Sequence, residues 1–157
     1  MYIGQASATG NDLTIYDISS PISPFLVGGA DPAQAINSVF VSGKYAYLGT
    51  AATNEFQIYD ISNPANPLLI SSTSTGTTAI NSVFVSGRFT YLGDSDSSGT
   101  LRIYDVSNPY SPSQVSTITA SDAINSVFGL GKYVYLSKAA NAGACNFLTA
   151  TGCELQV

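Results

Sequence analysis

The sequence Ile-Asn-Ser-Val-Phe occurs three times in this chain of 157 residues, at a constant spacing of 44 residues. Each copy is followed by glycine, a basic residue and an aromatic residue, and then by a Tyr-Leu pair. The tripeptide Ile-Tyr-Asp also recurs, each time before a connection that contains proline. A period of this length is typical of stacked or radial repeats, in which one unit alone cannot bury its apolar face. The three copies are Ile36–Phe40, Ile80–Phe84 and Ile124–Phe128.

One unit, residues 36–79, predicts four short antiparallel strands. The first two, Ile36–Ser42 and Tyr45–Gly49, flank a hairpin turn that contains glycine. The third and fourth, Phe56–Ile61 and Leu68–Thr73, are joined through prolines that prevent a helical connection. Both faces of these strands carry apolar residues, so neighbouring sheets should cover both. The pattern predicts an all-β fold, a β-propeller with four-stranded blades of 44 residues.

Side-chain alternation gives a further expectation for the first strand of each unit. Strict alternation places Val39 and Val41 on one face and Ile36 and Phe40 largely on the other. The rival architecture is a β-solenoid, whose rungs are usually shorter and lack hairpin turns. The hairpin signals favour the propeller.

The repeat divides residues 1–157, a single repeat domain, into two full blades and two partial ones. The chain therefore holds about three and a half blades, whereas closed propellers usually have four to eight. Two interpretations remain open. A second chain closes the ring by completing the partial blades, or the sequence is a fragment of a longer propeller. The units are residues 1–35 (partial), 36–79, 80–123 and 124–157 (partial).

Two recurring phrases resemble those of a known family. They are Ile-Tyr-Asp-Ile/Val-Ser-Asn-Pro-x-x-Pro, and Val-x-Gly-x-Tyr-x-Tyr-Leu with small departures between copies. Together they resemble the LVIVD repeats of bacterial and archaeal surface or secreted proteins. The resemblance covers nearly the whole chain. It implies a β-propeller, an extracellular or cell-surface location and a binding or scaffolding role, and it supplies no catalytic residues.

Composition excludes several function classes. A net charge of −5 with only five basic residues disfavours nucleic acid as a partner. No segment has the length of a membrane span. The chain has no histidine, which removes Ser-His-Asp and Cys-His catalysis, and it has no Gly-rich phosphate loop. A low charged fraction of 10% fits an exported protein.

We therefore expect a non-catalytic binding or assembly scaffold without a cofactor. Its expected partners are further blades or a second copy of itself, and a surface glycan or protein as ligand. Two alternatives remain: a carbohydrate-active enzyme that uses loop carboxylates, and a purely structural subunit that self-assembles.

Loops that differ between units indicate where a ligand would bind. The turns between first and second strands are nearly constant, whereas residues 50–55, 94–100 and 138–154 differ in length and content. We expect these variable loops to share one face, where binding differences accumulate. An enzyme would draw on Asp94, Asp96 and Glu154. The ligand-binding candidates are Thr50, Asn54, Asp94, Asp96, Asn141 and Asn146.

The segment from Asp94 to Gly99 also resembles the start of a calcium loop. Asp94, Asp96 and Ser98 place oxygens at alternating positions, and Gly99 stands where such loops turn. A polar hairpin tip is the favoured alternative. In the longest loop, Cys145 and Cys153 predict a disulfide, with two free thiols as the alternative.

Two sets of charged residues recur once per unit. The basic set forms an arc that could meet an anionic polymer, although solvated turn residues are the favoured reading. The aspartates precede a Ser-x-Pro or Ser-Asn-Pro connection and are expected to accept hydrogen bonds from turn amides. The sets are Lys44, Arg88 and Lys132, and Asp17, Asp60 and Asp105.

Overall fold

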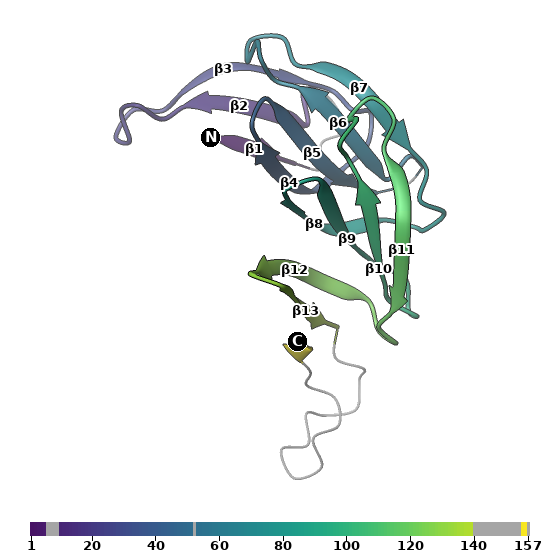
Figure 1. The fold of residues 1–157 in the computed structure, drawn as a ribbon. Helices are drawn as coiled ribbons and strands as arrows, with labels where there is room; N and C mark the ends of the chain where they lie inside the picture. The colour runs from purple at the N-terminus through teal and green to yellow at the C-terminus, as the bar shows by residue number, and fades with distance from the viewer. Residues whose placement is uncertain (6–9, 52, 140–154, 157) are drawn as a thin grey trace.

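The computed structural model describes residues 1–5, 10–51, 53–139 and 155–156, and within them every regular element is a β-strand (Figure 1). The strands form four antiparallel sheets that follow one another along the chain. No helix in these described residues is long and apolar enough to cross a membrane. The strands are β1 (Tyr2–Gly4), β2 (Leu13–Asp17), β3 (Phe25–Ala30), β4 (Ile36–Ser42), β5 (Tyr45–Thr50), β6 (Phe56–Asp60), β7 (Leu68–Thr73), β8 (Ile80–Ser86), β9 (Phe89–Asp94), β10 (Thr100–Asp105), β11 (Ser113–Thr119), β12 (Ile124–Leu130), β13 (Tyr133–Lys138) and β14 (Leu155–Gln156).

Two of the four sheets have four strands each, in the orders β4-β5-β6-β7 and β8-β9-β10-β11. The first sheet has the order β1-β2-β3, and the last, in its described part, has the order β12-β13-β14. The strands predicted for residues 36–79 agree with β4 to β7 to within one residue at each end. The all-β fold with four-stranded, blade-like sheets is therefore confirmed.

The apolar core lies between the sheets. Strands β5 and β6 are buried along almost their whole length, as expected when a neighbour covers each face. Three clusters form, one at each junction between successive sheets. Their buried members include Leu13, Ile15, Ile36 and Leu48 at the first junction, Phe56, Ile58, Ile80 and Val83 at the second, and Leu101, Ile124, Val127 and Leu136 at the third.

Side chains of the Ile-Asn-Ser-Val-Phe repeat join the first strands of successive sheets. The Asn37 side-chain amide donates to the carbonyl of Ile80 at 3.2 Å, and the Val83 amide donates to the Ser38 hydroxyl at 3.0 Å. We call these two contacts the inter-sheet hydrogen bonds. They recur at the next junction, from Asn81 to Ile124 at 3.1 Å and from Val127 to Ser82 at 2.9 Å. The repeated Asn-Ser pair thus fixes one sheet against the next.

A β-bulge in each first strand positions these side chains. In β4 the pairing with β5 shifts between Ile36 and Ser38, and β8 and β12 shift at the equivalent place. The expectation that Ile36 shares a face with Phe40 is wrong, because the extra residue of a bulge reverses the alternation. Ile36 instead packs in the same cluster as Val39 and Val41.

A glycine near the end of each second strand allows the next sheet to approach. A Cβ atom on Gly49 would lie 2.6 Å from Cγ2 of Ile80, which is closer than real side chains come. Gly4 and Gly93 face the equivalent isoleucines of the following sheets in the same way. In the last sheet Ser137 occupies this position.

We expect Asn81→Ala to lower the free energy of unfolding by about 1 kcal/mol, because it removes a hydrogen bond and leaves the Ile124 carbonyl without its donor. The matched control is Asn125→Ala. Asn125 has the same repeat position but is exposed on β12, the first strand of the last sheet. Urea unfolding of dilute protein measures both. Equal losses for the two variants would contradict the role given to the inter-sheet hydrogen bonds.

Candidate functional site

The constant turns and the Asp-x-Ser connections lie together on one face of the molecule. The amide of Ile61 donates to the carbonyl of Lys44 at 2.9 Å, and the Lys44 ammonium lies 3.4 Å from the Asp60 carboxylate. The next sheet repeats both contacts, through Val106 and Arg88 at 2.8 Å and through Arg88 and Asp105 at 2.6 Å. We call this the constant-turn face.

The recurring aspartates accept hydrogen bonds from turn amides, as predicted. The carboxylate of Asp60 accepts from the amide and the hydroxyl of Ser62, at 2.9 Å and 2.6 Å. Asp17 accepts from the amide of Ser19 at 2.7 Å, and Asp105 from that of Ser107 at 2.8 Å. Hydrogen bonds from Ser62, and secondarily the charge of Lys44, lower the pKa of Asp60 below its ordinary value. The three aspartates thus hold the connection that follows their strand in each sheet.

The recurring basic residues each contact an aromatic neighbour. Their charged groups lie about 5 Å from the centres of the adjacent rings, within the range of a cation–π contact. Two of them also pair with the aspartates described above. Because their charges are already in contact with neighbouring groups, these basic residues are better interpreted as structural turn residues than as a binding site for an anionic polymer. The contacts are Lys44 with Tyr45, Arg88 with Phe89 and Lys132 with Tyr133.

The aspartate contacts predict a specific pH dependence. Because folding lowers the pKa values of Asp60 and Asp105 from the ordinary 3.8, their stabilisation is complete above that pH and is lost as pH falls through the lower folded values. The double variant Asp60→Asn, Asp105→Asn should be less stable than the unchanged chain at pH 6 and closer to it at pH 2.5. Thermal melts across this range measure the gap, and a gap independent of pH would contradict the assignment.

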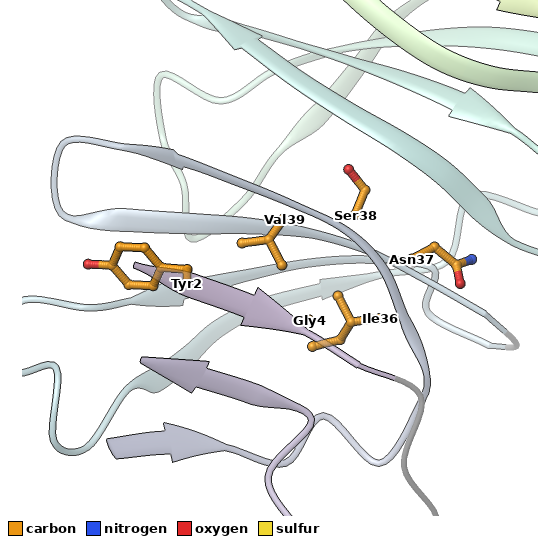
Figure 2. A pocket seen from close by; sticks show the side chains of 6 residues that line it. All are labelled: Tyr2, Gly4, Ile36, Asn37, Ser38 and Val39. Carbon is orange, nitrogen blue, oxygen red and sulfur yellow. The ribbon is translucent and has the colours of Figure 1, made fainter. Parts of the chain in front are cut away.

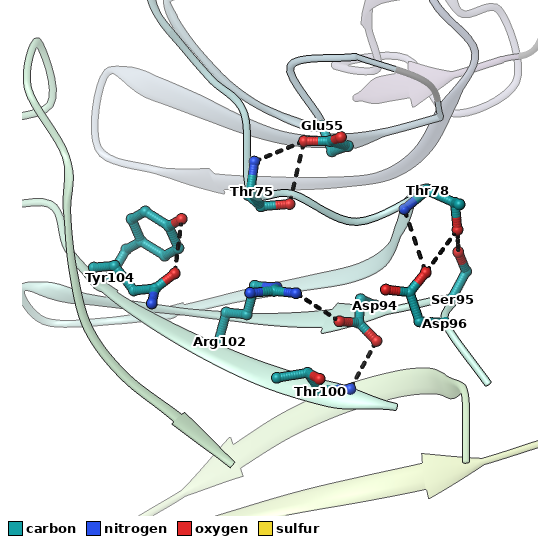
Figure 3. Close-up of polar contacts among 10 residues, drawn as sticks. Glu55, Thr75, Thr78, Asp94, Ser95, Asp96, Thr100, Arg102 and Tyr104 are labelled. Carbon is teal, nitrogen blue, oxygen red and sulfur yellow. Dashed lines mark hydrogen bonds and ion pairs between the residues drawn. The ribbon is translucent and has the colours of Figure 1, made fainter. Parts of the chain in front are cut away.

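The described variable loops, residues 50–55 and 94–100, lie together on the opposite face, whereas most of the third, residues 138–154, falls outside the described residues. Loops that join one sheet to the next contact the loops between second and third strands (Figure 3). Buried Glu55 accepts from the Thr75 amide at 2.7 Å and from its hydroxyl at 3.2 Å. The amide of Ser95 donates to the carbonyl of Ala79 at 3.0 Å. We call this the variable-loop face.

Asp94 is the most enclosed carboxylate of the variable-loop face, with no exposed surface. One of its oxygens accepts from the amide of Thr100 at 2.7 Å, and the other lies 3.3 Å from the guanidinium of Arg102. Burial raises the pKa of the Asp94 carboxyl and the nearby charge of Asp96 adds to this, while the Thr100 amide and Arg102 oppose it. Its described contacts tie β9 to β10.

Asp96 ties two loops together. One of its oxygens accepts from the Thr78 hydroxyl at 2.8 Å and from the Thr78 amide at 3.3 Å (Figure 3). The Thr78 hydroxyl also lies 2.9 Å from that of Ser95. Burial acts to raise the pKa of Asp96, but the hydrogen bonds from Thr78 and the charge of Arg102 oppose it, and the net shift is downward.

The remaining sequence candidates fall into three groups. Thr50 is fully buried, and its hydroxyl contacts the Gln34 side chain at 3.1 Å and the Asn54 carbonyl at 3.3 Å. Asn54 is exposed at a turn with φ of 61°, and Ser98 is exposed at a loop tip. Within the described part of the chain, no group of three or more acidic or cysteine residues could hold a metal ion. Asn141, Cys145, Asn146, Cys153 and Glu154 lie outside the described residues.

Sequence reasoning missed two charged residues of this face, Glu55, which binds Thr75, and Arg102, which pairs with Asp94. Comparison between repeats carries a signal for Arg102, because Asp94 and Arg102 replace the neutral Thr50 and Gln57 at the same repeat positions. A change from two neutral residues to two opposite charges indicates that the side chains meet. Glu55, which precedes β6, has an acidic counterpart in Asp12, which precedes the equivalent strand β2 and is also buried.

The Asp94–Arg102 pair can be tested with the residues that the neighbouring sheet carries. Arg102→Gln alone should cost about 3 kcal/mol of stability, because it leaves a buried carboxylate without its cation. The double variant Asp94→Thr, Arg102→Gln recreates the neutral pair of β5 and β6 and should recover most of the loss. Chemical unfolding measures all variants, and additive losses would contradict a direct interaction.

Sheets of four antiparallel strands, packed face to face in sequence order, define the chain as a β-propeller-type repeat protein. Its repeats match the LVIVD repeat over residues 2–31, 35–75 and 79–119, so the chain belongs to the LVIVD repeat family. The resemblance inferred from the sequence phrases is thereby confirmed over residues 2–119, and the match does not extend to the last unit, residues 124–157. A comparison with curated protein sequences finds no match.

Solved structures support the same fold. The computationally designed Ika8 protein aligns with a TM-score of 0.64 at 11% identity, over 88% of this chain and 43% of Ika8. The computationally designed Ika4 protein aligns with a TM-score of 0.59 at 11% identity, over 88% of this chain and 85% of Ika4. The chain thus spans less than half the length of Ika8. At such low identity the likeness is one of fold alone.

Proposed function

We propose that this protein is a non-catalytic β-propeller scaffold of the cell surface or extracellular space, which binds a polar ligand on its variable-loop face. The observation that carries the proposal is the gathering of the variable loops on one face of a rigid repeat scaffold. Hydrogen bonds between loops hold them in place, as between Glu55 and Thr75. A rigid frame with variable loops is a common arrangement for binding sites.

The exposed residues of the variable-loop face suggest the class of ligand. Several of them carry hydroxyl or amide groups, including Thr53, Asn54, Ser97 and Ser98. Such groups suit the hydroxyls of a glycan, or a polar protein surface as a second candidate. An exported setting is supported by the scarcity of charged residues, at 10% of the chain.

Catalysis by the loop carboxylates is the less favoured function. A hydrolytic acid or base must reach its substrate, whereas Asp94 is fully buried and pairs with Arg102. One oxygen of Asp96 is engaged by Thr78. These contacts support a structural role for the two aspartates and a binding role for the exposed polar residues around them.

The test is binding of the 157-residue chain to a panel of neutral bacterial surface polysaccharides, with hydrolysis followed in the same samples. A loop variant combines Thr53→Ala, Asn54→Gly, Ser97→Ala and Ser98→Ala. Glycine suits the left-handed backbone at position 54. We expect binding without hydrolysis, weakened at least about tenfold in this variant.

The control carries Ser42→Ala and Ser86→Ala, two exposed serines of the constant turns. It should bind as the unchanged chain does. Binding lost in the control but kept in the loop variant would place the ligand on the constant-turn face and contradict the proposal. Hydrolysis that Asp94→Asn abolishes would contradict the binding proposal and indicate a carbohydrate-active enzyme.

A further inference from the structure

The loops that lead from the last strand of one sheet to the first strand of the next share one backbone arrangement. We call these segments, residues 31–35, 74–79 and 120–123, the joining loops. At the end of each, an alanine carbonyl accepts a hydrogen bond from the amide of the residue that follows the second strand of the new sheet. The distances are 2.9 Å from Ala51 to Ala35, 3.0 Å from Ser95 to Ala79 and 2.7 Å from Ala139 to Ala123. Each joining loop is thus tied to the sheet that it enters.

Two of the joining loops are also tied to the sheet that they leave. Thr75 donates from its amide and its hydroxyl to Glu55, which precedes β6. The amide of Ala120 donates to the carbonyl of Gly99 at 2.6 Å. A Cβ atom on Gly99 would collide with the backbone carbonyl of Asp122, so the two loops lie in close contact there. Because these joining loops are bonded at both ends, they form a fixed support across the variable-loop face.

One exposed residue of each joining loop has a left-handed backbone. In one loop it is glycine, Gly76, with φ of 75°, whereas Ala33 and Ser121 adopt the same region, with φ of 58° and 75°, at an energetic cost. Among the described residues other than glycine, positive φ occurs at these two positions and at Asn54, all on the variable-loop face. Backbone strain that is confined to one face in this way is typical of functional sites.

The inter-sheet hydrogen bonds set the spacing of the loops. Figure 2 shows Ser38 on the side of β4 opposite to Ile36 and Val39, and there its hydroxyl accepts from the amide of Val83 in the next sheet. The same contact recurs one sheet further along. Packed sheets lie about 10 Å apart. Equivalent loops of successive sheets therefore stand at a fixed distance and in a similar orientation.

Exposed polar side chains form two groups on this support. The first group, Thr53 and Asn54, lies on the loop between β5 and β6, and the second, Ser97 and Ser98, lies on the equivalent loop between β9 and β10. Each group offers uncharged hydroxyl or amide groups. Similar polar groups that recur at a fixed interval suit a ligand whose own polar groups recur at a fixed interval.

We propose that the ligand of the variable-loop face is a linear, neutral polysaccharide that contacts both groups at once. This inference rests on the proposed function and names the form of the ligand at the same site. A polymer that spans both groups makes its second contact intramolecular, so two weak contacts combine into a stronger one without any new interaction. A single sugar reaches one group only and gains nothing from the other.

The experiment uses the polysaccharide that binds best in the panel described above, cut into fractions of increasing length from the disaccharide upward. Calorimetry gives the dissociation constant of each fraction for the 157-residue chain. We expect the affinity to rise at least about tenfold at the length that first spans both groups, and to change only gradually beyond it. We call this rise the length step.

Two variants separate the groups. One carries Thr53→Ala with Asn54→Gly, and the other carries Ser97→Ala with Ser98→Ala; all four residues are exposed. Each variant should lose the length step, while short fractions still bind at the group that remains. The control with Ser42→Ala and Ser86→Ala should keep the step.

An affinity without a length step would overturn the inference and leave the proposed function standing, as would a step that both variants keep. A variant that loses short and long fractions equally would also overturn it, because that result indicates one undivided site. Absence of binding by every polysaccharide of the panel would instead contradict the proposed function, and the inference with it.

Discussion

The junction between successive first strands is the contact on which the rest of the structure depends. Each sheet is apolar on both faces, so it is stable only between neighbours. Apolar burial supplies the stabilisation but does not by itself fix how one sheet is placed on the next. The inter-sheet hydrogen bonds, from Asn37 to Ile80 and from Val83 to Ser38, supply that registry because they are directional. They explain why Asn and Ser recur at a fixed spacing within an otherwise apolar strand.

The repeat gives the molecule two faces, and the charged residues make different contacts on each. On the constant-turn face the charged residues satisfy one another and the turn amides, as Asp60 does with Ser62 and Lys44. On the variable-loop face the buried charges link one loop to another, as Glu55 does with Thr75, or one strand end to the next, as Asp94 does with Thr100. Many of the charged groups are thus engaged in internal contacts, and several exposed residues of the variable-loop face carry hydroxyl or amide groups.

The candidate site was predictable in outline but not in detail. Differences between repeats located the two described variable loops, residues 50–55 and 94–100, because such loops tolerate change where the scaffold does not. They did not separate exposed Asn54 from buried Thr50, since both are small polar residues of one loop. The oxygens on the sequence neighbours of Asp94 suggest a calcium loop, with a polar hairpin tip as the favoured alternative. Its partner Arg102, on the next strand, gives it a different environment.

The sequence by itself determined the repeat, the strand boundaries and the burial of both faces, because hydrophobic period, glycine turns and prolines act locally along the chain. The tertiary structure decided the phase of each first strand, since the bulge at Asn37 forms where its side chain reaches the next sheet. It also decided which polar groups are exposed, such as Asn54, and which are buried, such as Thr50. These features arise where one sheet meets another, so no single repeat contains them.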